Sequence, residues 1–175
     1  NSSYKDMMTV AHILKGKHAH PDVSFAVAPG SRQVLQMLTR EGALADLIDV
    51  GARVMESACG FCIGNSQSPQ TNAVSLRTSN RNFEGRSGTR SAQVYLVSPE
   101  TAAAAVITGK FTDPRDLGMD YPDIGMPARF FIDDSMFIFP DSTATAGAVE
   151  IYRGPNIGDP PQSDPLPEEI KGEVT

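Results

Sequence analysis

Long apolar runs, a dense set of cysteines and an excess of basic residues are all missing from this sequence. No apolar stretch approaches the roughly 20 residues that a membrane-spanning helix needs, and no secretory leader is visible at the start. Two cysteines in 175 residues do not make a disulfide scaffold, so we expect a reducing, cytoplasmic setting. The net charge of −6 provides no basic field for phosphate, which argues against a nucleic-acid partner, as the missing apolar run argues against a membrane.

What is present is the composition of an ordinary globular domain. Hydrophobic residues make up 40% and charged residues 21% of the chain, which is enough apolar material for a real core. The first residues, Asn1-Ser2-Ser3-Tyr4, read as if cut from a longer polypeptide. We therefore expect one domain of a larger protein.

Helical and strand patterns alternate through the first 109 residues. Ser3, Ser31 and Ser98 stand at helix-capping positions, and Asp6 lies at the capping-box distance from Ser3. With a further helix over residues 43–50, these caps predict four helices, the last ended by Gly109. Short, mostly apolar runs predict strands over residues 23–28, 53–57, 73–78 and 94–97.

This alternation predicts an α/β fold with a mainly parallel sheet flanked by helices. In such sheets, ligand-binding loops gather at the carboxyl ends of the strands. Cys59 follows one predicted strand, and Asn80 and Arg81 follow the next. We therefore expect these residues to meet at one edge of the sheet.

The composition of the chain changes after residue 110, where prolines separate short segments. We expect an α/β domain over residues 1–120 and a C-terminal extension packed on it over residues 121–153, with residues 136–139 as an apolar contact. Residues 154–175 are rich in Pro, Asp and Gly and predict an extended linker toward another domain.

The two cysteines form a C-x-x-C loop, Cys59-Gly60-Phe61-Cys62. By itself this pattern fits a redox dithiol, half of a zinc site, part of an iron–sulfur site or two structural thiols. A redox pair normally precedes a helix, and no strong helix pattern follows here. Zinc needs two further ligands, and the three histidines lie upstream without ligand spacing.

A second motif, Asn80-Arg81-Asn82-Phe83-Glu84-Gly85-Arg86, places two arginines around a glycine turn. Loop arginines are most often simply solvated. Here Gly85 allows a tight turn and Phe83 can anchor the loop in the core, so Arg81 and Arg86 can point to one site. Guanidinium groups bind carboxylates through paired hydrogen bonds, which predicts an anionic, carboxylate-bearing substrate.

Together, the two motifs resemble the aconitase superfamily, which includes aconitate hydratase, homoaconitase and isopropylmalate isomerase. The stretch Ala58-Cys59-Gly60-Phe61-Cys62-Ile63-Gly64 has the family's form and looks most like aconitase itself. Ala28-Pro29-Gly30-Ser31, Val97-Ser98-Pro99-Glu100 and Arg153-Gly154-Pro155-Asn156 resemble further family blocks, the last being the linker to a mobile swivel domain.

This resemblance implies a [4Fe–4S] cluster with Cys59 and Cys62 as two of its three cysteine ligands, the third lying two residues before Asn1. It also implies that Asn80, Arg81 and Arg86 bind the substrate, while the catalytic base and the histidines lie in other domains. We assign no catalytic residue to this chain, and we expect the fragment alone to be inactive.

The reaction implied is that of aconitate hydratase, a lyase of the tricarboxylic acid cycle that interconverts citrate and isocitrate through cis-aconitate. Its partners would be these tricarboxylates and the remaining domains of the parent chain. Isomerisation of isopropylmalate or homoaconitate is the alternative within the family. A regulatory, RNA-binding form without the cluster is an alternative of another class, against which the acidic balance weighs.

Overall fold

The computed structural model describes residues 2–165, 167–169, 171 and 172, with only the backbone of Phe61. The chain divides into two compact units, Asn1–Asp134 and Ser135–Thr175. The division falls inside the extension that the sequence predicts over residues 121–153.

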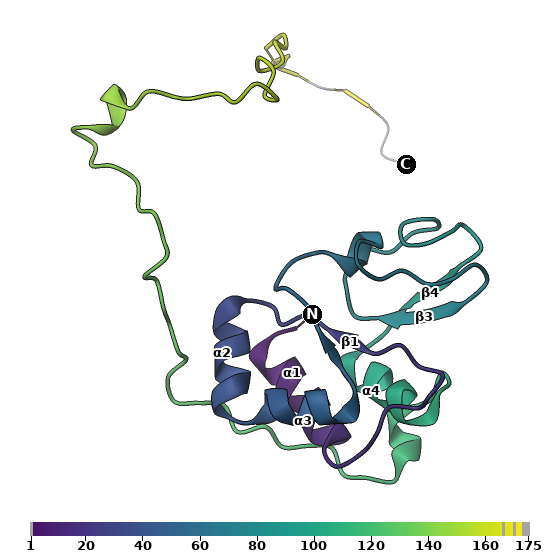
Figure 1. The fold of residues 1–175 in the computed structure, drawn as a ribbon. Helices are drawn as coiled ribbons and strands as arrows, with labels where there is room; N and C mark the ends of the chain where they lie inside the picture. The colour runs from purple at the N-terminus through teal and green to yellow at the C-terminus, as the bar shows by residue number, and fades with distance from the viewer. Residues whose placement is uncertain (1, 166, 170, 173–175) are drawn as a thin grey trace. The chain divides into compact units, whose positions relative to one another are not determined.

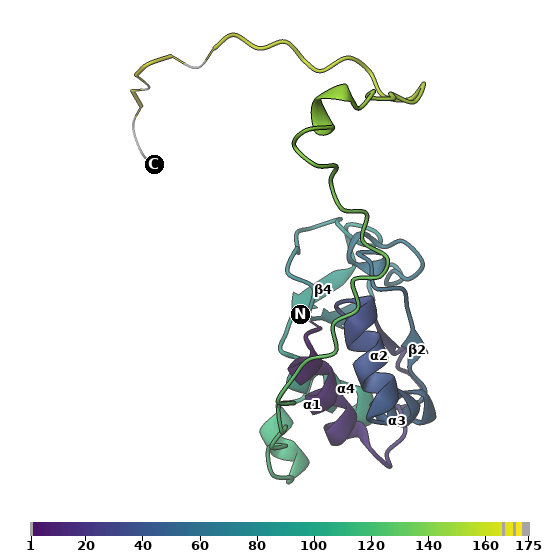
Figure 2. The ribbon, with the colours of Figure 1, turned by 90° about the vertical axis from the view of Figure 1, so that its left-hand side faces the viewer.

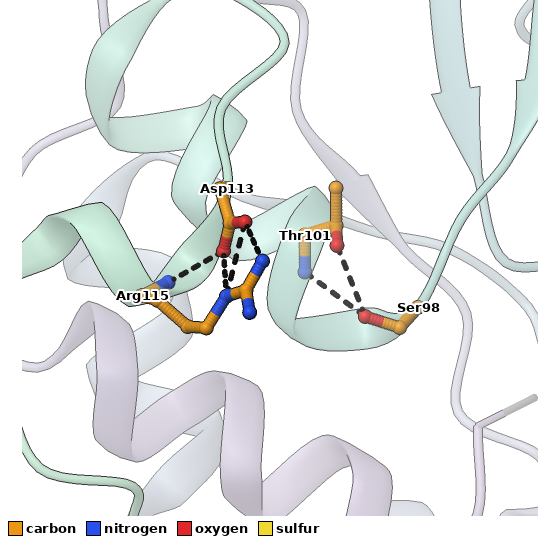
Figure 3. Close-up of polar contacts among 4 residues, drawn as sticks. All are labelled: Ser98, Thr101, Asp113 and Arg115. Atoms are coloured by element: carbon orange, nitrogen blue, oxygen red, sulfur yellow. Dashed lines mark hydrogen bonds and ion pairs between the residues drawn. The ribbon is translucent and has the colours of Figure 1, made fainter.

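Four α-helices form in the first unit, as the capping pattern predicts (Figure 1). The Ser3 hydroxyl accepts the backbone N–H of Asp6, whose carboxylate accepts the backbone N–H of Ser3 in return, so the capping box is complete. The Ser98 hydroxyl accepts the N–H of Thr101 at 3.2 Å (Figure 3). The helices are α1 (Tyr4–Leu14), α2 (Arg32–Arg40), α3 (Ala43–Val50) and α4 (Pro99–Thr108), and the 3₁₀ turns are η1 (Phe61–Ile63), η2 (Pro114–Leu117) and η3 (Ala146–Ala148).

All of the strand pairing between described residues is parallel, which confirms the predicted α/β class. Strand β1 (Ala26–Val27) pairs with β2 (Arg53–Val54), and β3 (Val74–Arg77) pairs with β4 (Gln93–Leu96). The strands are shorter than predicted, and they form two separate pairs rather than one sheet.

The hydrophobic core lies mainly where the helices of the first unit meet. Leu14 of α1, Leu38 of α2 and Leu47 of α3 are fully buried, and Ala103 and Val106 bring α4 into the same cluster. Burying an apolar side chain of this size contributes about 1.5–3 kcal/mol each. The helical layer therefore supplies the stable base from which the strand-end loops extend.

A segment after α4 runs back over the first helices (Figure 2). We call residues 124–133 the strap. Its Phe130 ring meets the Tyr4 ring edge-on at 6.2 Å between centroids, and the Arg40 guanidinium lies 3.8 Å from the centre of the Phe131 ring. Gln33 Nε2 donates to the Asp133 carbonyl at 3.0 Å. The strap thus ties α1 and α2 to the C-terminal part of this unit.

The second unit contains little regular structure among its described residues beyond η3. Phe137, Ile138 and Phe139 are 63%, 99% and 69% exposed. The expected packing of residues 136–139 on the domain stays a prediction. No helix in the described part of the chain is long and apolar enough to cross a bilayer.

Candidate functional site

A large cleft in the first unit collects the residues that the sequence singles out. It has a volume of about 1380 Å³, and it is bordered by strand β1, strand β3 and the loops that follow β2 and β3. The lining includes every predicted site residue: Cys59, Cys62, Asn80, Arg81 and Arg86. The two motifs meet in one cleft, as expected, but the strands before them belong to two separate pairs and not to one sheet edge.

The cysteine loop is a tight turn leading into η1. The backbone N–H of Asn65 donates to the Gly60 carbonyl at 3.1 Å, and Gly64 takes a positive φ of 79°, a conformation that favours glycine. Cys59 is exposed and Cys62 is 4% exposed, and their sulfurs are joined in a disulfide. The two sulfur atoms therefore occupy one place on the cleft wall.

The arginine loop brings Arg86 to the same place. Arg86 Nη2 lies 3.9 Å from the Cys62 sulfur, and Arg86 Nε is buried without a hydrogen-bond partner among the described residues. Asn82 Nδ2 anchors the loop by donating to the Val94 carbonyl of β4 at 2.9 Å. The predicted anchoring through Phe83 is wrong, because this side chain is 57% exposed and lies beneath the Arg86 guanidinium at 5.5 Å.

Arg81 and Asn80 stand on the rim of the cleft with exposed side chains. The described residues offer neither of these side chains an ion pair or a hydrogen bond. In contrast, the neighbouring Glu84 is already paired with Arg90 at 3.2 Å. Guanidinium and amide donors are therefore available to an anion at this rim.

One arginine of the cleft is not identified by the sequence analysis. Arg77 is 9% exposed, and its Nε donates to Ser75 Oγ at 3.3 Å. Desolvation by burial lowers the pKa of Arg77 below its usual value. The alternation along β3 puts Arg77 and Val74 on opposite faces, so the sequence suggests a buried valine and an exposed arginine. In the structure the reverse holds, because the Val74 side chain is 57% exposed. The sequence feature that could have identified Arg77 is its position at the end of β3, shortly before Asn80 and Arg81.

Two hydroxyl groups near the arginine loop are also not identified by the sequence analysis. Ser79 Oγ, in the cleft lining, and Ser87 Oγ are buried and lack a hydrogen-bond partner among the described residues. A side chain added at Gly64 would approach Ser87 Oγ to 3.2 Å, so this hydroxyl lies against the cysteine loop. Nothing in the sequence distinguishes these serines from solvated loop residues.

The cysteine pair fits part of a metal or cluster site. Thiolates bind soft metals and iron–sulfur clusters, and the disulfide must first be reduced by two electrons to give two thiolates. Among the described residues, no group of three or more His, Cys, Asp or Glu side chains could hold a metal ion. The chain thus offers two converging sulfur donors beside an arginine, and a complete site needs further donors.

Fold and site together define an α/β domain with a paired-thiol loop facing an arginine-lined cleft. A profile described as "Aconitase family (aconitate hydratase)" matches residues 1–109. The chain belongs to this family.

Similar proteins carry the names of hydro-lyase subunits. The chain is 41% identical over 118 residues to the 3-isopropylmalate dehydratase large subunit of Wolinella succinogenes, and 42% identical over 118 residues to that of Herpetosiphon aurantiacus. It is 38% identical over 118 residues to the homoaconitase large subunit of Thermus thermophilus. Each match covers 67% of this chain and 28% of the relative, so the chain spans less than a third of the length of these relatives.

Proposed function

We propose that this chain is the cysteine-bearing domain of a hydro-lyase that moves a hydroxyl group between adjacent carbons of a hydroxy-polycarboxylate. The observation that carries the proposal is the meeting of Cys62 and Arg86, whose sulfur and Nη2 atoms lie 3.9 Å apart on one cleft wall. The two thiols and the Arg86 guanidinium can serve one reaction only if they reach the same ligand. The 3.9 Å spacing supports such a shared ligand.

In this proposal Cys59 and Cys62, once reduced, hold two corners of a [4Fe–4S] cluster. When bound, such a cluster supplies a Lewis-acidic iron that makes the substrate hydroxyl a better leaving group. The sequence contains two cysteines, so a third thiolate has to come from outside residues 1–175.

The arginines bind and orient the substrate. Arg81 and Arg86 each present a planar fork that can hold a carboxylate through two parallel hydrogen bonds, and Asn80 adds an amide to the same cleft. The buried, unpartnered Nε of Arg86 provides a donor already removed from water. A hydrogen bond to such a donor is worth more than one at an exposed site, which suits a site that must fix the substrate before water leaves.

Among substrates, a 3-isopropylmalate or homoaconitate type is favoured over citrate. This preference rests on the names of the relatives, 3-isopropylmalate dehydratase and homoaconitase large subunits. Because those relatives are large subunits, the proposal includes a second subunit or domain that completes the site.

Interconversion of citrate and isocitrate is the second candidate. It is favoured by the description of the matching family profile as aconitate hydratase, and by the Ala58-Cys59-Gly60-Phe61-Cys62-Ile63-Gly64 form of the cysteine loop. Both candidates use the same thiols and arginines, so only the third arm of the substrate separates them.

Substrate turnover tests the proposal. The full-length protein containing this chain is reconstituted with iron and sulfide without oxygen, and the absorbance of the unsaturated intermediate is followed with 3-isopropylmalate, homocitrate, citrate and isocitrate. We expect turnover of 3-isopropylmalate or homocitrate. Turnover of citrate and isocitrate alone would select the second candidate, and a reconstituted protein that converts none of the four would refute the hydro-lyase proposal.

The cysteine assignment has its own test. Cys59→Ser should lower the bound iron and remove the visible absorbance of the cluster, because a hydroxyl replaces a thiolate donor. Ser57→Ala is the matched control, since Ser57 lines the same cleft without a donor role in the proposal. Full iron content in Cys59→Ser would show that Cys59 is not a ligand.

A further inference from the structure

The cleft lining carries more positive than negative side chains. Its charged residues among those described are Arg77, Arg81, Arg86, Lys110, Asp6 and Asp22. A concave surface with an excess of cations attracts anions. The proposed function already uses Arg81 and Arg86, so Arg77 and Lys110 are the two cations without a role in it.

Of these two, Arg77 is buried and Lys110 is exposed. Arg77 is the last residue of β3, and 9% of its surface is open to solvent. No other Asp, Glu, Lys or Arg among the described residues is buried to this degree. Removing a guanidinium from water costs free energy, and costly ionisable groups in a cleft wall are frequently functional. Arg77 is therefore the cation to explain.

Ser79 gives an independent indication of a ligand at the same wall. Its Oγ is buried without a hydrogen-bond partner among the described residues, and Ser79 lines the cleft two residues after Arg77. Buried hydroxyl groups are nearly always hydrogen-bonded. A ligand that brings an acceptor into the cleft would complete this pairing.

The position of Arg77 lets it share a ligand with the arginine loop. A guanidinium has five N–H donors and can serve more than one acceptor, and the bond from Arg77 Nε to Ser75 Oγ at 3.3 Å fixes its orientation. An extended chain covers at most about 3.6 Å per residue, so the Cα atoms of Arg77 and Asn80 lie within about 11 Å of each other. A branched substrate can therefore contact both.

The substrates considered for this site differ in a single arm. Isocitrate, homoisocitrate and 3-isopropylmalate are all malates with a substituent on carbon 3. The substituent ends in a carboxylate in the first two and in methyl groups in the third. Arg81 and Arg86 provide one carboxylate-binding fork for each of the two malate carboxylates. The end of the third arm then remains to be bound.

We propose that Arg77, together with the Ser79 hydroxyl, binds a carboxylate at the end of the third arm and so selects a tricarboxylate over 3-isopropylmalate. An isopropyl group at the same place would displace water from the guanidinium and the hydroxyl and offer no hydrogen bond in return. A polar site of this kind rejects such an analogue strongly.

The inference rests on the proposed function, because it takes the malate backbone of the substrate from it. It also divides the candidates named there. Substrates of the homoaconitate and citrate types satisfy Arg77 and Ser79, whereas the 3-isopropylmalate type does not.

Equilibrium binding tests the role of Arg77 without turnover. The full-length protein containing this chain is prepared without iron and with reduced thiols, and calorimetry measures its affinity for isocitrate, homoisocitrate, 3-isopropylmalate and malate. Malate has no third arm and is the reference. We expect at least one tricarboxylate to bind about tenfold or more tightly than both malate and 3-isopropylmalate. Because no reaction is needed, this result is independent of whether the hydro-lyase proposal holds.

Three variants assign the preference to residues. Arg77→Met should weaken binding of the preferred tricarboxylate about 10- to 150-fold and leave malate unchanged, because only the arm loses its partner. Ser79→Ala should weaken the same ligand about 2- to 10-fold. Lys110→Met is the matched control, since it removes an exposed cation from the same cleft, and it should change each affinity by less than about threefold.

Three results would overturn the proposal. In the unaltered protein, 3-isopropylmalate would bind as tightly as both tricarboxylates. In Arg77→Met, malate would weaken as much as the tricarboxylates, which would indicate a structural role. In Lys110→Met, the tricarboxylates would weaken as much as in Arg77→Met, which would indicate a general effect of charge. If Arg77→Met does not fold, the unaltered protein and Ser79→Ala decide, and an unchanged tricarboxylate affinity in Ser79→Ala would refute the assigned site.

Discussion

Replacing Arg86 by lysine separates carboxylate binding from simple positive charge. Lysine keeps the charge but offers a point donor in place of the planar fork, so one of two parallel hydrogen bonds to a carboxylate is lost. A hydrogen bond to a charged group is worth about 1.5–3 kcal/mol. Since about 1.4 kcal/mol corresponds to a tenfold change in binding, Arg86→Lys should raise KM about 10- to 150-fold. The buried Nε of Arg86 places the expected value in the upper part of this range.

The assay measures kcat, KM and bound iron in the anaerobically purified full-length protein, with the substrate that it converts. Arg90→Lys is the matched control, because Arg90 belongs to the same loop but is 83% exposed and paired with Glu84. It should leave KM within about twofold, as exposed ion pairs contribute little. An unchanged KM in Arg86→Lys would refute the carboxylate role. Loss of iron with unchanged KM would instead indicate that Arg86 stabilises the Cys62 sulfur and does not bind the substrate.

Two further predictions concern stability and titration. Gly109 and Gly118 both have positive φ, at 75° and 63°, but a Cβ at Gly109 would lie 2.6 Å from the His20 ring, whereas one at Gly118 meets nothing within 4 Å. Gly118→Ala should therefore cost about 1–2 kcal/mol from backbone strain, and Gly109→Ala about 1–3 kcal/mol more from overpacking. Equal urea midpoints for the two variants would contradict the clash. Hydrogen bonds from the Arg115 side chain and backbone lower the pKa of Asp113 from 3.8 to about 2 (Figure 3). Because the folded pKa is depressed, this contact stabilises the fold above the unfolded value and is lost as pH falls through about 2. Carboxyl NMR should find this midpoint and find it raised in Arg115→Gln, and a midpoint near 3.8 in the unaltered chain would refute the contact.

The helices could be predicted from the sequence because their signals are local. Ser3, Ser31 and Ser98 each accept a backbone N–H from the first turn of the helix that they cap. Strand length was less predictable, since a strand extends only as far as its neighbour does. Within the run over residues 53–57 only Arg53 and Val54 form a strand, because β1 is equally short.

The meeting of the two site motifs could also be predicted, since both follow parallel strands. Their contacts could not. The burial of Arg77 and Ser87 and the exposure of Phe83 depend on which segments lie above them, and no pattern within either loop encodes those neighbours. The Arg40–Phe131 contact joins residues from distant parts of the sequence, and no local sequence pattern around either residue predicts it.

The strap also determines where a mechanical load would go. A force applied to the chain beyond residue 134 is transmitted first through Phe131 and Asp133 to Arg40 and Gln33 on α2. It therefore reaches the packed helical layer before it reaches the loops that carry the cysteines and arginines. Tension at residue 134 would therefore leave the spacing between Cys62 and Arg86 largely undisturbed.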